Sequence, residues 1–284
     1  MSSFVQIRNQ GPSEVHAAAK ETELLERLAA IPSLLIALSG GADSAYLAWA
    51  AHLALGERAL SVTAISPSYS SYDRQELEKF VKQTSVRHEF VETHEMENPA
   101  YRANAGDRCY YCKDELFSVL DKLARERGFA AVAYGVNADD TSDFRPGHRA
   151  AAEHQVLAPL LDAKMTKADI RALSRRAGLA TCDRPASACL SSRLPYGTEV
   201  TPERLSLVEK GEAILRELEF RQFRVRLHDK LARIEIAPDE LPKAMTPEMG
   251  GMIARRFKKA GFLYVSLDLE GYRQGSLNEV LKGK

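Results

Sequence analysis

The chain has 284 residues, of which 45% are hydrophobic and 27% are charged, as is usual for a soluble globular protein. A chain of this length most often folds into about two domains. Its 39 lysines and arginines equal its 39 aspartates and glutamates in number, so the formal net charge is zero. This balance excludes a protein whose main task is to coat nucleic acid or an anionic membrane.

Four cysteines are too few for a disulfide-stapled scaffold in a chain of this length. The first residues, MSSFVQIRNQ, lack the apolar core of a secretory signal. The longest aliphatic run, LLIAL at 34–38, is far shorter than the roughly 20 residues that cross a bilayer. We therefore expect a cytoplasmic protein with reduced thiols and no membrane-spanning segment.

The first two thirds of the chain alternate between helical and strand patterns. Apolar residues recur at helical spacing in four stretches: 15–31, 44–55, 72–84 and 112–127. Four shorter apolar runs indicate strands: LLIAL (34–38), LSVTAI (60–65), the weaker HEFVE (88–92) and AAVAYGV (130–136). Runs that are apolar on both faces are typical of a parallel sheet between helix layers. We predict a doubly wound α/β domain over residues 15–198, preceded by an N-terminal extension, 1–14.

The pattern changes after residue 198. The predicted elements there are, in order, a helix at 201–219, the strands QFRVRLH (222–228) and LARIEI (231–236), a helix at 247–260 and the strand LYVSLDL (263–269). This order predicts a smaller α+β domain over residues 199–284, suited to substrate binding or oligomerisation. No long linker precedes it, so we expect the two domains to pack together.

The most informative stretch is SGGADS, which lies between the strand at 34–38 and the helix at 44–55. Two glycines let successive N–H groups point into one concavity, and the following helix N-terminus adds partial positive charge, which suits a pyrophosphate. The loop lacks the lysine of a Walker A motif. The alternative is a plain strand-to-helix turn. The candidate phosphate ligands are Ser39, Gly40, Gly41, Asp43 and Ser44.

In this context the loop resembles the SGGxDS motif of the ATP pyrophosphatase (PP-loop) superfamily. Its members cleave ATP between the α and β phosphates and move AMP onto a carboxylate or carbonyl oxygen, after which a nucleophile displaces the AMP. The resemblance implies ATP as a cosubstrate, a pyrophosphate held by the loop and Mg²⁺ near Asp43. It also implies an adenosine contact at Ser66, just past the second strand.

The cysteines decide which nucleophile is available. Cys109 and Cys112 form a CYYC motif at a helix start, where side chains three residues apart share a face and two thiolates can bind one metal or cluster. Cys182 and Cys189 follow with a C-x6-C spacing, wider than in most zinc sites. A four-thiolate zinc site, a redox-active disulfide and simple buried thiols are the alternatives.

Three further stretches narrow the resemblance: PASACLSSRLPYG (185–197), GVNADDTSDFRPG (135–147) and LDLEGYRQGSLNE (267–279). With the phosphate loop, they resemble the LarE family, ATP-dependent sulfur transferases of nickel-pincer nucleotide biosynthesis, from about residue 15 to the end. The resemblance implies that a carboxylate of pyridinium-3,5-biscarboxylic acid mononucleotide is adenylylated and becomes a thiocarboxylate, with release of AMP and pyrophosphate. It also implies a homo-oligomer.

The family uses two sulfur sources. One subtype sacrifices the sulfur of a single cysteine in the loop that here contains Cys189. Another holds a [4Fe-4S] cluster with three cysteines, and the fourth iron carries an extra sulfide. Because CYYC accompanies Cys189, the resemblance implies the cluster subtype, with Cys109, Cys112 and Cys189 as catalytic ligands and Cys182 as a spare thiol. A sacrificial Cys189 is the alternative.

The predicted hairpin carries a local basic site in a chain without net charge. Arg224 and Arg226 share one face of a strand by period two, and Arg233 lies on the partner strand. Guanidinium groups suit the phosphate and carboxylates of a pyridinium mononucleotide, so Arg224 and Arg226 are candidate substrate ligands. The alternative is a solvated sheet face with ion pairs to Glu235 or Glu212.

Other candidates follow the loop that contains Cys189, called the cysteine loop below, and the strand at 130–136. Arg193 is placed to meet the adenylate and to stabilise an oxyanion, or else it forms a loop salt bridge. Asp139, Asp140 and Asp143 follow a strand at the sheet edge where α/β proteins bind ligands, but they could equally cap turns. The sequence does not separate the three, and we name Asp140 as the candidate substrate ligand. Asp268 fits either a family ligand or a strand-end turn.

Three other functions stay open. A PP-loop tRNA thiolase can share three cysteines and a cluster, but it normally needs an RNA-binding appendage and a basic surface. An ATP-dependent amide synthetase needs an ammonia source. A nucleotide-binding regulatory module with structural zinc is the alternative from a different class. We favour a small-molecule nucleotide over nucleic acid as the substrate, with the sulfide source unknown.

Overall fold

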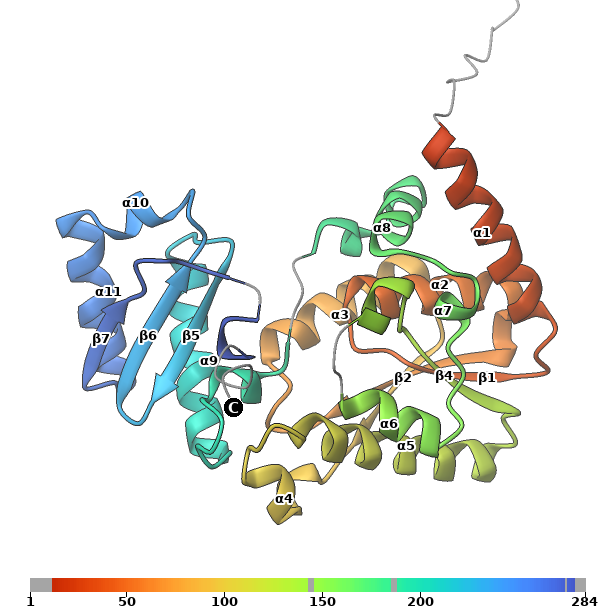
Figure 1. The fold of residues 1–284 in the computed structure, drawn as a ribbon, viewed down its shortest axis with the longest axis horizontal. Coiled ribbons are helices and arrows are strands. Elements are labelled where there is room, and N and C mark those ends of the chain that lie inside the picture. The colour runs from red at the N-terminus through yellow and green to blue at the C-terminus, as the bar shows by residue number, and fades with distance from the viewer. Residues whose placement is uncertain (1–11, 143–145, 185–187, 274, 279–284) are drawn as a thin grey trace, which may run out of the picture.

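The computed structural model describes residues 12–142, 146–184, 188–273 and 275–278, which contain two β-sheets (Figure 1). The larger sheet has four parallel strands in the order β3-β2-β1-β4. These strands are β1 (Leu34–Ala37), β2 (Ala59–Ile65), β3 (His88–Glu92) and β4 (Ala131–Tyr134). The expected α/β class with a parallel sheet is therefore confirmed.

Helices cover both faces of the parallel sheet (Figure 1). One layer contains α1 (Pro12–Ala29), α2 (Ala42–Leu55), α3 (Ser71–Thr84) and α8 (Lys167–Arg176). The other contains α5 (Arg108–Arg127) and α6 (Pro146–Glu153). Two one-turn helices, α4 (Pro99–Arg102) and α7 (Pro159–Asp162), lie in the connections.

Strand β1 shows why both layers are needed. Leu34 and Ile36 pack into the core under α1, α2 and α8, whereas Leu35 and Ala37 pack against α5 and α6. Successive side chains of a strand point to opposite faces, so an apolar run can be buried only between two helix layers. The apolar run LLIAL therefore indicates a strand that lies between two helix layers.

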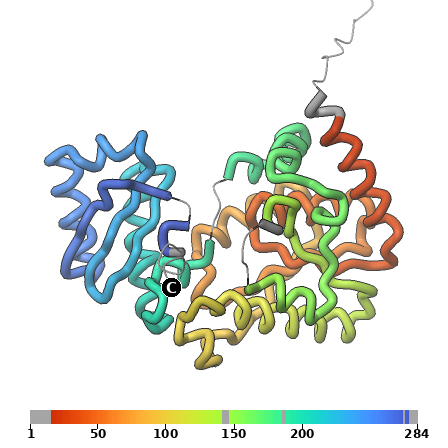
Figure 2. Tube along the Cα trace, in the orientation of Figure 1, coloured from red at the N-terminus to blue at the C-terminus, as the bar shows by residue number. Residues whose placement is uncertain are grey.

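A second, three-stranded sheet follows in the chain: β5 (Phe223–His228), β6 (Leu231–Ile236) and β7 (Tyr264–Leu267). Strands β5 and β6 are antiparallel, whereas β6 and β7 are parallel. The helices beside it are α9 (Pro202–Glu217), α10 (Leu241–Ala244) and α11 (Pro247–Ala260). In Figure 2 this sheet, in blue, lies to one side of the parallel sheet and not on either of its helix layers.

The interior of the second sheet reaches back into the first part of the chain. Val225, Ile234 and Phe257 form one buried cluster with Tyr101 and Leu190, which precede residue 198. Cys112 packs against the same cluster. The division at 198 and 199 stays a prediction, but Cys112 lies where helix α5 of the first part meets the core of the second sheet.

Several helices differ from the sequence expectation, including α6, which was not predicted. Helix α5 begins at Arg108 rather than at 112, which places Cys109 and Cys112 in its first turns. Helix α8 was not predicted, although Thr166 and Asp169 form a capping box at its start. No helix in the described part of the chain combines the length and apolar character needed to cross a membrane.

A histidine links α5 and α6, the two helices that cover one face of the parallel sheet. His154, at the end of α6, contacts Asp121 Oδ2 at 2.6 Å through Nδ1 and Asp114 Oδ1 at 3.0 Å through Nε2. Both aspartates lie on α5. Burial alone would lower the pKa of His154, but the two carboxylates outweigh it and the pKa is raised.

Because the folded state raises the pKa of His154, protonation of this histidine stabilises the fold. Its contribution should be fully present below the unfolded pKa of about 6.5 and be lost as the pH rises through the raised folded value. We expect the difference in unfolding free energy between the wild type and His154→Gln, measured with urea from pH 5.5 to 9, to shrink as the pH rises. His16→Gln, at an exposed position on α1, is the control. A difference that is constant across this range would contradict the prediction.

Candidate functional site

The phosphate loop joins β1 to α2 at the carboxyl edge of the parallel sheet. Gly40 has a φ of +80°, in the left-handed region that favours glycine. The hydroxyl oxygens of Ser39 and Ser44 lie 3.0 Å apart, and the backbone N–H of Ser39 donates to Ser44 Oγ at 3.1 Å. Ser44 Oγ donates to the Gly41 carbonyl at 3.1 Å. The residues singled out in SGGADS thus form one compact turn at the start of α2.

Arg184 ties this loop to the start of α3. One of its guanidinium nitrogens donates to the Gly40 carbonyl at 2.7 Å, and another donates to Asp73 Oδ1 at 2.5 Å. Ser70, the N-cap of α3, donates to the second carboxylate oxygen of Asp73 at 2.6 Å. Arg184 was not predicted as a site residue, because a single arginine in a loop carries no local signal.

The loop after β4 packs directly on the first turn of α2. A Cβ atom on Gly135 would lie 2.6 Å from the backbone nitrogen of Ser44 and 2.7 Å from its Cα, closer than Cβ atoms approach in proteins. Two residues later, Asn137 Nδ2 donates to Asp43 Oδ2 at 3.1 Å. Glycine at 135 therefore permits a contact that lets Asn137 orient the aspartate of the phosphate loop.

Asp43 and Asp140 form an acidic pair beside the phosphate loop. Burial and the negative charge of Asp140 raise the pKa of Asp43, while the charge of Lys167 and the hydrogen bond from Asn137 oppose the shift. Lys167 Nζ lies 3.1 Å from Asp140 Oδ1 and partly neutralises the pair. Asp140 is therefore a neighbour of the predicted pyrophosphate ligands.

The other two aspartates of this stretch are placed differently. Asp139 accepts the backbone N–H of Lys167 at 2.8 Å, in the first turn of α8. Asp143 lies outside the described residues. Of Asp139 and Asp140, the structure brings Asp140 next to Asp43.

Asp43 and Asp140 are the carboxylates that could bind the expected magnesium ion. Within the described residues, no group of three or more His, Cys, Asp or Glu side chains is arranged to hold a metal ion. Mg²⁺ is usually held by one or two carboxylates together with substrate phosphates and water. The Asp43–Asp140 pair fits that mode of binding, because a cation would relieve the repulsion that raises the pKa of Asp43.

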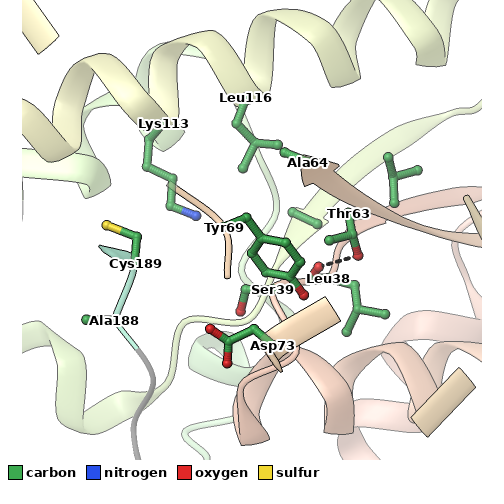
Figure 3. Close-up of a pocket in the computed structure, with 12 residues that line it drawn as sticks. Leu38, Ser39, Thr63, Ala64, Tyr69, Asp73, Lys113, Leu116, Ala188 and Cys189 are labelled. Carbon is green, nitrogen blue, oxygen red and sulfur yellow. Dashed lines mark hydrogen bonds between the residues drawn. The ribbon is translucent and has the colours of Figure 1, made fainter. Parts of the chain in front are cut away.

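A cavity of about 150 Å³ opens between the phosphate loop and the cysteine loop (Figure 3). Its apolar walls include Leu38, Val62, Ala64 and Leu116, from the carboxyl ends of β1 and β2 and from α5. Such walls suit the face of an aromatic base. Cys189 closes the cavity on the side opposite the β-strands.

Polar groups line the same cavity. Ser39, Asp73 and the ammonium group of Lys113 face it, as Figure 3 shows. The hydroxyl of Tyr69 is buried and has no hydrogen-bond partner among the described residues. The cavity therefore combines an apolar slot with a cation and an unused hydroxyl, which suits a nucleotide carrying phosphate.

Ser66, the expected adenosine contact, is not part of this lining. Its hydroxyl donates to Glu95 Oε1 at 2.5 Å and lies 2.9 Å from Ser68 Oγ. Ser66 thus lies next to the cavity and is engaged with the protein.

Three of the four cysteines gather at one place. Cys109 is exposed in the first turn of α5, and Cys112 lies one turn later. Burial raises the pKa of the Cys112 thiol, and negative charge on Cys189 raises it further. Cys189 lies just before the short helix η5 (Leu190–Arg193). The three thiols suit an iron–sulfur cluster in number and kind, although within the described residues they are not arranged to hold one metal ion together.

Cys182 lies in different surroundings, in the short helix η4 (Ala180–Asp183). Its thiol donates to Asp183 Oδ2 at 3.4 Å, and Arg175 is its other charged neighbour. A zinc site of four thiolates would need Cys182 beside the other three, so this placement disfavours that alternative.

Arg193 is buried, with an exposed fraction of 3%. Its Nε donates to Glu212 Oε1 at 2.7 Å, and one terminal nitrogen donates to the Ala188 carbonyl at 2.7 Å and to Ser192 Oγ at 2.8 Å. The residue therefore makes the salt bridge that was the alternative in the sequence, and it fastens the cysteine loop to α9.

Arg226 also contacts the cysteine loop. It donates to the Ser192 carbonyl at 2.8 Å and to Glu235 Oε2 at 2.8 Å. It pairs across the hairpin with Arg233, which binds the other oxygen of Glu235 at 3.1 Å. The hairpin face is thus mostly buried and not solvated, but the expected ion pair with Glu235 is present. Arg233 also lies 3.6 Å from Asp268.

Arg224 lies beside these groups. Its guanidinium carbon is 5.1 Å from the centre of the Tyr272 ring. Burial lowers the pKa of Arg224, and the nearby charge of Arg193 lowers it further. Arg224 and Arg226, from the second sheet, thus lie close to the cysteine loop and its own Arg193.

Comparison with known proteins identifies the family. The chain is 44% identical over 247 residues to an uncharacterized protein of Synechocystis. The aligned residues make up 87% of this chain and 92% of that protein. It is 32% identical over 270 residues to the pyridinium-3,5-bisthiocarboxylic acid mononucleotide synthase of Lactiplantibacillus plantarum. The aligned residues make up 93% of this chain and 95% of that enzyme. The chain belongs to this LarE family.

A shorter match is to an uncharacterized protein of Methanocaldococcus jannaschii, 34% identical over 170 residues, which are 60% of this chain and 66% of that protein. A scan against protein-family models found no match.

The close approach at Gly135 predicts the effect of one added methyl group. In Gly135→Ala the new Cβ would overlap the backbone of Ser44, so the start of α2 or the loop after β4 must move. We expect a loss of stability of about 1–3 kcal/mol and weaker ATP binding, measured by urea unfolding and calorimetric titration.

Gly250→Ala, inside α11, is the matched control, because the nearest atom to its new Cβ is 3.7 Å away and alanine favours helix. Unchanged ATP affinity and stability in Gly135→Ala would show that the contact has no such role.

Proposed function

We propose that the protein is an ATP-dependent sulfur transferase. It adenylylates a carboxylate of pyridinium-3,5-biscarboxylic acid mononucleotide and converts it to a thiocarboxylate, with release of AMP and pyrophosphate. The name of the Lactiplantibacillus plantarum relative, a synthase of the bisthiocarboxylic acid mononucleotide, supports this substrate class and product.

One observation carries the proposal: Ser39 of the phosphate loop and Cys189 of the cysteine loop line the same cavity (Figure 3). An enzyme that activates a carboxylate with ATP and then attacks it with sulfur needs both groups within reach of one carbon atom. A regulatory module that only binds a nucleotide has no need for the sulfur.

In the first step, a carboxylate oxygen of the substrate attacks the α-phosphorus of ATP. The bond between that phosphorus and the bridging α–β oxygen breaks, and pyrophosphate leaves. The N–H groups and hydroxyls of the loop at Ser39, Gly41 and Ser44 would hold the leaving pyrophosphate. Mg²⁺ bound by Asp43 and Asp140 would offset its charge.

In the second step, sulfur attacks the activated carboxyl carbon. A C–S bond forms, and the C–O bond to AMP breaks with its electron pair on the AMP oxygen. The ammonium group of Lys113 lies in the cavity beside Cys189, where it would stabilise the phosphate of the departing AMP (Figure 3).

The substrate is a small anion, and the arginines of the second sheet suit it. Arg224 is the candidate that contacts it, because its guanidinium group lies near that of Arg193 and against the ring of Tyr272. The guanidinium groups of Arg193 and Arg226 bind Glu212, Glu235 and carbonyls of the cysteine loop. We therefore assign Arg193 and Arg226 mainly to positioning that loop, and Arg224 to the substrate phosphate or carboxylate.

The sulfur source has two candidate forms. Cys109, Cys112 and Cys189 fit a [4Fe-4S] cluster in number and kind, and such a cluster with one open iron would supply an exchangeable sulfide. Alternatively, Cys189 gives up its own sulfur when its Cβ–S bond breaks and its α-proton is lost, which leaves dehydroalanine. The gathering of three thiols, with Cys182 apart, favours the cluster.

The reaction is tested by incubating anaerobically purified protein with ATP, Mg²⁺ and the biscarboxylic mononucleotide. We expect AMP and pyrophosphate in equal amounts, and a product in which one carboxylate oxygen is replaced by sulfur, as measured by mass spectrometry. Asp43→Asn should slow pyrophosphate release, because it removes a carboxylate next to the leaving group.

Absence of substrate-dependent pyrophosphate release would refute the adenylylation. Pyrophosphate release without sulfur in the product would refute only the sulfur transfer. It would favour the alternative of an ATP-dependent amide synthetase. Thiolation of tRNA in place of the mononucleotide would support the nucleic-acid alternative.

The two sulfur sources predict different outcomes for Cys109→Ala. With a cluster, the wild type contains about four iron atoms per chain, and the variant loses iron and repeated sulfur transfer but still releases pyrophosphate. Cys182→Ala is the matched control and should keep both activities, since Cys182 lies apart from the other thiols. Iron analysis and turnover counting measure the effect.

Sulfur transfer that persists in Cys109→Ala at one event per chain, with dehydroalanine at 189, would establish the sacrificial route. One zinc and no iron in the wild type would exclude the cluster.

A further inference from the structure

Arg108, the first residue of α5, is a buried cation next to the gathered thiols. Its side chain has an exposed fraction of 5%. It donates to Asn104 Oδ1, to the Ser191 carbonyl at 2.9 Å and to Cys109 Sγ at 3.9 Å. These contacts join α5, the turn before it and the cysteine loop through one guanidinium group.

Three arginines in the described chain are buried beyond nine tenths, and two of them have a carboxylate partner. Arg193 binds Glu212 at 2.7 Å and Arg226 binds Glu235 at 2.8 Å. No carboxylate among the described residues lies within salt-bridge distance of Arg108. Its oxygen partners, an amide and a backbone carbonyl, are neutral.

A buried charge without a counter-charge is strongly unfavourable, and an arginine in a protein does not lose its proton. The groups near Arg108 that can carry negative charge are Cys189, Cys109 and Tyr101. The hydroxyl of Tyr101 is buried and lies 2.7 Å from Ser191 Oγ, where it stays neutral. Among the described residues, the sulfur atoms of Cys109 and Cys189 are thus the groups that can supply the missing negative charge.

We infer that Arg108 is the charge partner of the sulfur site, holding anionic sulfur at Cys109 and Cys189 by direct electrostatic attraction. The inference rests on the proposed function, in which these sulfurs are anionic, either as cluster ligands or as a sulfur donor. A cavity that must also accept ATP and an anionic substrate needs such a cation, because the anions would otherwise repel one another.

A pair of alkylating reagents measures this electrostatic effect without ATP, substrate or cluster. Iodoacetate and iodoacetamide attack the same thiolate, but only iodoacetate is anionic, so the ratio of their rates reports the local potential and not the reactivity of the thiol. In the metal-free full-length chain, we expect this ratio at Cys109 to be several-fold higher in the folded protein than in urea. Peptide mass spectrometry gives the rate at each cysteine.

Variants of Arg108 test which group produces the potential. Arg108→Gln should lower the ratio at Cys109 several-fold, whereas Arg108→Lys should keep most of it because the charge stays. Arg102→Gln, an exposed arginine on α4 paired with Glu199, should leave it unchanged. Cys182 serves as the internal control thiol, because it lies near Arg175 and not near Arg108.

The ratio separates an electrostatic role from a merely structural one, which the hydrogen bonds to Asn104 and Ser191 alone would give. An equal ratio at Cys109 in the folded and the unfolded wild type would overturn the inference, even if Arg108→Gln failed to fold. So would a folded Arg108→Gln protein with the wild-type ratio.

The same variants have a second readout when the protein holds a cluster. Loss of a positive charge makes it harder to add an electron, so Arg108→Gln should lower the midpoint potential and Arg108→Lys should largely restore it. A wild type without thiocarboxylate product would refute the proposed function, and one without iron would refute only the cluster, but both would leave the alkylation result standing. An unchanged potential in a cluster-loaded Arg108→Gln would refute the inference and leave the function standing.

Discussion

The site depends on one constraint, the fixing of the cysteine loop by buried guanidinium groups. Arg193 donates to the carbonyl of Ala188, Arg108 to that of Ser191 and Arg226 to that of Ser192. The three arginines come from the loop itself, from α5 and from the second sheet. Because each donates to a backbone carbonyl, the loop is held through its main chain. Cys189 is thereby placed at the cavity while its sulfur stays available for chemistry.

The phosphate side of the cavity is built by a different means, close backbone packing. The loop after β4 can rest on the start of α2 only because position 135 has no side chain, and this contact brings Asn137 to Asp43. Arg184 then links the carbonyl of Gly40 to α3. The two sides of the cavity meet through α5, whose first turns carry the cysteines and Lys113. A shift of this helix would therefore move the sulfur and the cation together.

Local patterns predicted the parts of the site that are contiguous in the chain. The run LLIAL and the glycines after it gave strand, loop and helix, because burial on both faces and left-handed backbone at Gly40 are properties of neighbouring residues. Period two correctly placed Arg224 and Arg226 on one face, but it could not decide whether Arg226 binds a ligand or Glu235. Arg108 and Arg184 gave no signal, since the loop carbonyls that they bind, at Ser191 and Gly40, lie 83 and 144 residues away. Asp139 and Asp140 looked alike for the same reason: only the packing of α8 separates them.

Although the chain has no net charge, the cations of this site have two different roles. Arginines that pair with a buried carboxylate, such as Arg193 with Glu212, add little net potential, because the two charges largely cancel at the distance of a ligand. They can define geometry without attracting anions. Arg108 and Lys113 have no carboxylate within salt-bridge distance among the described residues, so their potential reaches the cavity uncancelled. The proposed reaction, whose cosubstrate, substrate and sulfur would all be negative, needs both kinds of cation, one to hold the loop and the other to bring the anions together.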